Sequence, residues 1–186
     1  MKTIKSLSII LLLSSFIISA QKVELNVEKS NVKWAGKKIT NSSHSGSLKF
    51  KSGSVTFSGD VIETGKFIVD MTTINVEDLA GKSKARLEGH LKSDDFFSTE
   101  EFTESTLEIN SSTKDGDLLK VSGNLTIKGI SSPVEFEMKK DGDNWLSSLT
   151  FDRSKHNVRF GSGSFFENLG DKLILDEIEL EVTLSF

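Results

Sequence analysis

The chain closes with the run Glu177-Ile178-Glu179-Leu180-Glu181-Val182-Thr183-Leu184-Ser185-Phe186, in which polar and apolar side chains alternate strictly. A period of two places the apolar residues on one face of a β-strand and the polar residues on the other. Antiparallel sheets with one buried and one solvated face have this pattern. The segment therefore predicts a strand that covers an apolar interior and meets water on its outer side.

The same alternation recurs from Lys22 onward. The other alternating runs cover residues 22–28, 54–58, 67–71, 107–109, 119–128 and 134–139. Turn dipeptides such as Asp115-Gly116 and Asp141-Gly142 separate these runs, and the single proline, Pro133, stands at a strand entrance. We expect about eight strands, the number that closes into a barrel able to hold an internal ligand. The predicted fold is all-β: a single antiparallel β-barrel.

Two segments depart from the strand period. Between Asp78 and Phe97, Leu87 and Leu91 stand four residues apart among charged side chains. This spacing predicts a short amphipathic helix over residues 82–93, although Gly89 within it costs about 1 kcal/mol relative to alanine. The glycine-rich residues 161–170 are expected to form a loop with one helical turn.

The first twenty residues have the pattern of a secretory signal peptide. Lys2 and Lys5 precede an apolar stretch, and Ala20 supplies a small residue for cleavage. The alternative is a membrane anchor, but the stretch of about a dozen residues is shorter than the roughly 20 that span a bilayer. We predict a signal peptide over residues 1–20, a mature domain over residues 21–186, and a periplasmic or secreted location in a bacterium.

Composition excludes several classes of function. The 23 basic and 27 acidic side chains give a net charge of −4, which argues against a nucleic-acid partner because such binding rests on clustered lysine and arginine. The chain has no cysteine, so it has no disulfide, thiolate zinc site, iron–sulfur cluster or cysteine nucleophile. It also has 13 phenylalanines and no tyrosine, so few of its aromatic side chains carry a polar group.

Catalytic motifs are absent from the sequence. His44, His90 and His156 have no metal-ligand spacing, and no Gly-x-Ser-x-Gly motif is present. Asp94 and Asp95 are adjacent, so their carboxylates point apart and form a poor acid/base pair. We therefore predict no enzyme, no catalytic residue, no metal and no cofactor. A zinc site assembled from the three histidines, or an enzyme in which His44, His90 and a carboxylate meet in a cleft, are the alternatives.

The phenylalanines suggest a pocket. Many lie on the predicted buried faces, and core packing explains any single one, but together in a barrel they are typical of a wall around an apolar ligand. Strands of about ten residues, at about 3.3 Å each, would enclose a tunnel of roughly 30 Å. Such a tunnel suits a long chain. The sequence leaves open whether the barrel is hollow or filled by its own side chains.

Several motifs together resemble a known family. The most specific are His90-Leu91-Lys92-Ser93-Asp94-Asp95-Phe96-Phe97 and Leu125-Thr126-Ile127-Lys128-Gly129. Residues 32–38, 67–74, 133–134 and 151–154 complete the set. In order and spacing the set resembles the YceI-like family of secreted lipid-binding proteins over essentially the whole mature chain.

The resemblance implies an extended, lipocalin-like barrel that encloses a polyisoprenoid or another long-chain lipid for carriage or storage, without catalytic residues or metal. From the buried faces and the family motifs together, the candidate tunnel-wall residues are Phe57, Phe67, Val69, Phe96, Phe97, Leu125, Ile127, Phe136 and Phe151. His90, Arg153 and Lys155 are candidates for contact with a polar head group, since Arg153 and Lys155 offer positive charge to an anion. The alternative is that these three residues only tie loops to the barrel.

Two functional hypotheses follow. In the first, a secreted carrier or storage protein shields a lipid from water and keeps no stable membrane anchor after signal cleavage. In the second, a solid-core barrel serves as an interaction or stress-response module without a bound lipid. The interior of the barrel distinguishes them, because only the first requires an elongated apolar tunnel. The sequence does not indicate the oligomeric state.

Overall fold

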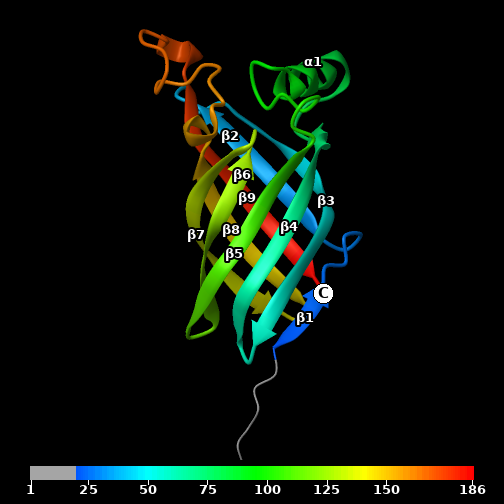
Figure 1. Ribbon diagram of the computed structural model, residues 1–186. Helices are drawn as coiled ribbons and strands as arrows, with labels where there is room; N and C mark the ends of the chain where they lie inside the picture. The colour runs from blue at the N-terminus through cyan, green and yellow to red at the C-terminus, as the bar shows by residue number, and fades with distance from the viewer. Residues whose placement is uncertain (1–19) are drawn as a thin grey trace, which may run out of the picture.

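The computed structural model describes residues 20–186 and consists of an elongated antiparallel β-barrel with one α-helix at one end (Figure 1). The predicted signal peptide, apart from Ala20, lies outside the described residues. The strands are β1 (Gln21–Glu24), β2 (Asn31–Lys38), β3 (Ser43–Ser58), β4 (Val61–Val76), β5 (Glu104–Asp115), β6 (Leu118–Ile127), β7 (Ile130–Asp141), β8 (Asn144–Asp152) and β9 (Ile174–Ser185). Among the described residues, no helix is long and apolar enough to cross a membrane.

Eight strands close the barrel. Neighbouring strands follow the order β3-β2-β9-β8-β7-β6-β5-β4, and β4 pairs with β3 to complete the ring. β1 is an additional strand that pairs with the second half of β3, where Gln21 lies opposite Phe57. Closure leaves no free edge among the eight strands, and an exposed edge is a site of unwanted pairing with other chains. The prediction of an antiparallel barrel of about eight strands is confirmed.

The C-terminal run forms β9, and its apolar side chains point inward and its glutamates outward, as the alternation predicts. Ile178 and Leu184 are buried, whereas Glu177, Glu179 and Glu181 are exposed. β9 pairs with β2 on one side and with β8 on the other. Because both neighbours place their apolar residues on the same side, β9 joins the large apolar cluster of the barrel interior, and a second, smaller cluster lies around Leu91 and Phe96.

One end of the barrel carries three tight turns. The hairpins β3–β4, β5–β6 and β7–β8 contain Gly59, Gly116 and Gly142, each with a φ near +60°, a conformation that glycine adopts at no steric cost. Inside this end, Phe57 stacks on Trp145 at 5.8 Å between ring centroids and meets Phe186 edge-on at 6.2 Å. We call this the hairpin end.

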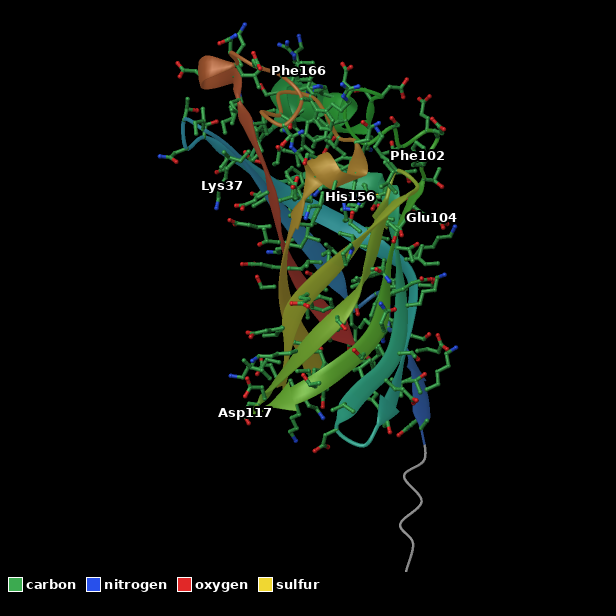
Figure 2. All side chains as sticks on the ribbon, turned by 60° about the vertical axis from the view of Figure 1, so that its left-hand side comes forward. Lys37, Phe102, Glu104, Asp117, His156 and Phe166 are labelled. Carbon is green, nitrogen blue, oxygen red and sulfur yellow. The ribbon has the colours of Figure 1, made fainter. Side chains whose placement is uncertain are left out.

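The other end carries the long connections. The helix α1 (Gly81–Lys92) joins β4 to β5, and residues 153–173, with the short helices η1 (Arg153–His156) and η2 (Gly170–Lys172), join β8 to β9. Figure 1 shows both connections over the same end of the barrel, and Figure 2 shows Phe166 at this end and Asp117 at the hairpin end. The helix expected over residues 82–93 is confirmed within one residue at each boundary. We call this the helix end.

Arg153 holds the connection between β8 and β9 in place. Its side chain is fully buried, and its guanidinium lies 3.2 Å from Asp176 Oδ1. The guanidinium also donates hydrogen bonds of 3.0–3.1 Å to the backbone carbonyls of Val158, Phe160, Ile174 and Leu175. Four of the five N–H groups thus donate to carbonyls, and the fifth lies beside the carboxylate. This arrangement favours the loop-tying alternative for Arg153 over contact with a head group.

His156, three residues after Arg153 in the short helix η1, is also buried. Its side chain is 1% exposed, and Nδ1 lies 2.9 Å from the carbonyl oxygen of Ile130. A carbonyl only accepts, so Nδ1 carries the proton. Burial lowers the pKa of His156 below its usual range, against the opposing effects of the Ile130 hydrogen bond and Asp152.

We expect the stability of the fold to decrease as the pH falls below about 6.5, the ordinary histidine pKa. Because the folded pKa is depressed, the unfolded chain takes up the proton more readily, and stability is complete only above this pH. His156→Asn retains a donor for Ile130 but does not titrate. Its melting temperature between pH 7.5 and 5.5 should therefore change less than that of the original chain. Both proteins keep the other two histidines. Equal changes of melting temperature with pH in the two proteins would therefore contradict the assignment of the pH dependence to His156.

Candidate functional site

An apolar cavity of about 400 Å³ occupies the helix end of the barrel. Its walls come from seven of the barrel strands, from α1 and from the connection between β8 and β9. The helix contributes Leu87, His90 and Leu91, so the cavity lies beneath it, and Phe160 and Lys172 contribute from the opposite connection. The volume lies in the range of about 300–1,000 Å³ that is usual for small-molecule sites.

A smaller cavity of about 80 Å³ continues toward the hairpin end. Five residues line both cavities: Val32, Val69, Ser105, Leu125 and Leu180. Along β9, the residues that line one cavity or the other extend from Ile174 to Leu184. The ten residue-to-residue steps between them, at about 3.3 Å each, correspond to about 33 Å of strand. The apolar interior is therefore long and narrow, with most of its volume near the helix.

The sequence-predicted wall residues divide between the two cavities. The larger cavity is lined by Val69, Phe96, Phe97, Leu125, Ile127 and Phe151. Phe67 and Phe136 line the smaller cavity, which Val69 and Leu125 also reach. Phe57 lines neither and belongs instead to the aromatic cluster with Trp145 at the hairpin end. Strand alternation identifies the inward face but not the height along the barrel, which explains why Phe57 lies outside both cavities.

Aromatic rings gather where the cavity approaches α1. His90 meets Phe160 edge-on at 4.4 Å between ring centroids and Phe96 at 5.7 Å, and Phe96 meets Phe97 at 5.2 Å. Such edge-to-face pairs add stability beyond their buried area. His90 thus lies at the helix end of the cavity, near the position expected for a polar head group, and packs within an aromatic cluster.

Positive charge at the helix end comes from residues other than those the sequence indicated. Lys38 and Lys172 line the larger cavity, and within residues 20–186 neither has a carboxylate within 4 Å. Lys37 also lines it but is paired with Glu179 at 2.5 Å. Lys155, in contrast, is exposed and lines neither cavity.

The histidines do not assemble into a metal site within the described part of the chain, where no group of three or more His, Asp or Glu could hold an ion. His44 and His90 both line the larger cavity, and His44 Nδ1 lies 2.7 Å from Asp78 Oδ2. Burial opposes the charge on Asp78, but hydrogen bonds from the Ser45 amide and from His44 outweigh it and lower the pKa of Asp78. This pair joins the start of β3 to the second residue after β4.

Sequence reasoning missed several residues of the cavity wall. Trp34, Met71, Ile74 and Phe160 all line the larger cavity. A signal was available for Trp34, because Val32 and Trp34 alternate with the polar residues Asn31 and Lys33 along β2. No comparable signal marks Phe160, which lies in an irregular connection and reaches the cavity only through the fold.

The fold is shared with solved structures of low sequence identity. Burkholderia cenocepacia BcnA has a TM-score of 0.66 at 19% identity, covering 86% of this chain and 98% of its own. A domain from Saccharophagus degradans, described as polyisoprenoid-binding and implicated in plant cell wall breakdown, has a TM-score of 0.58 at 13% identity. That match covers 89% of this chain and 97% of the domain. At these identities the likeness shows the fold alone.

Sequence relatives agree with this fold. The protein YceI of Escherichia coli O157:H7 is 33% identical over 97 residues, which are 52% of this chain and 49% of that protein. The chain thus matches about half the length of this curated relative. The protein YceI of Salmonella arizonae is 27% identical over 143 residues, 75% of this chain and 72% of the relative. The YceI-like domain matches residues 24–186, nearly all of the described chain, and the chain therefore belongs to the YceI-like family.

Proposed function

We propose that this protein encloses a long apolar lipid, such as a polyisoprenoid chain, along the axis of its barrel. The observation that carries the proposal is the apolar cavity of about 400 Å³ beneath α1, with its narrow extension toward the hairpin end. Each 100 Å² of ligand surface removed from water contributes roughly 2.5 kcal/mol. A long hydrocarbon chain therefore binds tightly without any polar recognition.

Two further observations support a hollow, lipid-filled barrel over a solid-core interaction module. The two cavities share lining residues, so the apolar space continues along the barrel, whereas a barrel filled by its own side chains would have no such continuous space. The polyisoprenoid-binding domain of Saccharophagus degradans has the same fold over most of its length. Phe57, Trp145 and Phe186 close the hairpin end with aromatic rings, so the lipid enters from the helix end.

The location and role that we propose are those of a carrier or store outside the cytoplasm. The signal-peptide pattern of residues 1–20 supports export, with cleavage after Ala20. An apolar lipid in an aqueous compartment needs a protein that shields it, and the barrel provides that shield. His90, together with Lys38 and Lys172, is placed to contact a polar group at the helix end of the cavity.

We expect protein purified from its own host to carry a lipid. Native mass spectrometry should show a mass above that of the chain from Gln21 to Phe186, and denaturation should remove the excess. Organic extraction followed by lipid analysis identifies the ligand, and the denatured mass tests cleavage after Ala20. Ligand-free protein that also fails to bind an added fluorescent long-chain lipid would sink the proposal.

A further inference from the structure

Exposed apolar side chains gather at the helix end of the barrel. Within residues 20–186, the large apolar side chains that are exposed are Ile39, Ile130, Leu146, Phe160 and Phe166. All of them except Leu146 lie at the helix end: Ile39 follows β2, Ile130 begins β7, and the two phenylalanines lie between β8 and β9. Figure 2 shows Phe166 at this end. Single exposed apolar residues are ordinary, but a group of them at one end of a molecule indicates an interaction surface.

Two open hollows adjoin the larger cavity at this end. The hollow beside α1 shares four lining residues with the cavity, among them Lys38 and His90. The hollow beside the connection between β8 and β9 shares Phe160 and Lys172 with it. Phe160 thus lines the cavity and is also exposed to solvent. The apolar lining of the cavity therefore continues onto the outer surface of the protein.

Basic side chains outnumber acidic ones in the two hollows. Their linings contain five basic residues: Lys38, Arg86, Lys128, Arg159 and Lys172. They contain two carboxylates, Asp94 and Asp95, both in the hollow beside the β8–β9 connection. The helix α1 itself has four basic residues and one acidic residue, whereas the whole chain has a net charge of −4. The helix end is therefore the more positive part of a negative protein.

Exposed apolar side chains beside positive charge fit the surface of an anionic bilayer. The apolar side chains enter the boundary between head groups and acyl chains, and the cations attract the lipid phosphates. A long apolar lipid is nearly insoluble in water, so its source and its destination are bilayers. A second copy of this chain would bring like charges together, which opposes self-association through this surface.

We propose that the helix end docks reversibly on a bilayer containing anionic lipids, through Ile39, Phe160 and Phe166 and the basic residues of the two hollows. The inference rests on the proposed lipid-binding function and adds the surface with which the protein exchanges its lipid. In the docked orientation the cavity faces the bilayer. An apolar lipid then enters or leaves the barrel without crossing water.

The test measures co-sedimentation of the mature chain with vesicles of phosphatidylcholine, alone or mixed with phosphatidylglycerol. The protein should bind the mixed vesicles at least tenfold more tightly than phosphatidylcholine alone, because each basic residue near an anionic surface favours binding by about fivefold. The preference should disappear at about 1 M salt, where charges are screened beyond about 3 Å.

The apolar contribution is tested with the double substitution Ile39→Ser and Phe166→Ser. Ile39 is 54% exposed and Phe166 is 46% exposed, and neither lines the larger cavity. Loss of both apolar side chains should weaken vesicle binding at least tenfold, with little change in melting temperature. Leu146→Ser is the matched control, because Leu146 is 39% exposed and lies near the hairpin end. This variant should bind vesicles like the original chain.

The charge contribution is tested with Arg86→Glu, on the exposed side of α1. This reversal should weaken binding to the mixed vesicles by about tenfold or more and leave binding to phosphatidylcholine unchanged. Lys139→Glu makes the same change of net charge at an exposed position opposite Leu146. It should change neither measurement.

The outcomes separate the docking surface from the proposed function. Absence of binding to the mixed vesicles, or equal losses in a helix-end variant and its control, overturns the docking inference. A dimer in solution that the Ile39→Ser and Phe166→Ser substitutions dissociate would place a second copy on this surface and would also overturn it. Uptake of a fluorescent long-chain lipid from cyclodextrin needs no vesicle, so its failure while vesicle binding persists would overturn the proposed function alone.

Discussion

Replacing Arg153 with methionine should lower the free energy of unfolding by about 3–5 kcal/mol, the usual cost of removing one partner from a buried ion pair. Methionine preserves much of the aliphatic volume but donates nothing. The substitution leaves Asp176 without its cation and removes the donors to four backbone carbonyls. For a domain of this size, the expected fall in melting temperature is on the order of 10 °C.

The matched control is Arg159→Met in the same connection. Arg159 is exposed and lies over the rings of Phe165 and Phe166, at 4.8 and 5.9 Å from their centroids. Exposed contacts of this kind contribute about 0.5–1 kcal/mol, so the control should melt close to the original protein. Arg153→Lys keeps the charge with fewer donors and should fall between the two. Similar melting temperatures for Arg153→Met and Arg159→Met would contradict the structural role of Arg153.

Substituting Leu125 with tryptophan should reduce the affinity for a long-chain lipid at least tenfold. Leu125 lines both cavities, so the larger ring would obstruct their junction and shorten the available tunnel. A loss of tenfold corresponds to about 1.4 kcal/mol, which is the free energy of removing about 55 Å² of apolar ligand contact. The measurement is displacement of a fluorescent long-chain lipid from delipidated protein.

Thr126→Trp controls for the added ring. Thr126 is the next residue on β6, and its side chain lies on the outer face by strand alternation. This variant should bind the lipid like the original chain. Melting curves of both variants show whether the barrel remains folded, since overpacking a core usually costs about 1–3 kcal/mol. Equal lipid affinity in the two folded variants would place the ligand somewhere other than the barrel axis.

Local pattern was sufficient to predict the barrel. Strand faces follow from a period of two, and β9 carries its apolar stripe and its exposed glutamates as the sequence indicates. Leu87 and Leu91 located α1 because a helical face needs only residues four apart. The register that closes β3 onto β4 contains several bulges, and no local pattern indicates their positions.

The site itself was only partly predictable, because a cavity is a property of the assembled fold. Phe96, Phe97 and Leu125, which the sequence suggests as tunnel-wall residues, all line the larger cavity. Arg153 donates to backbone carbonyls between 5 and 22 residues away. Because every residue has a backbone carbonyl, the sequence does not show which of them accept a hydrogen bond from a side chain.

Both ends of the described chain lie at the hairpin end of the barrel, opposite the proposed lipid entrance. Gln21 lies opposite Phe57, and Ser185 lies opposite Asn144, so both ends of the described chain emerge beside the tight hairpins. The helix α1 and the connection held by Arg153 lie at the far end (Figure 1). A tag, a support or a fused domain joined at either end of the described chain therefore leaves the proposed entrance facing outward. Immobilised in this way, the protein could load and release cargo as a uniformly oriented layer.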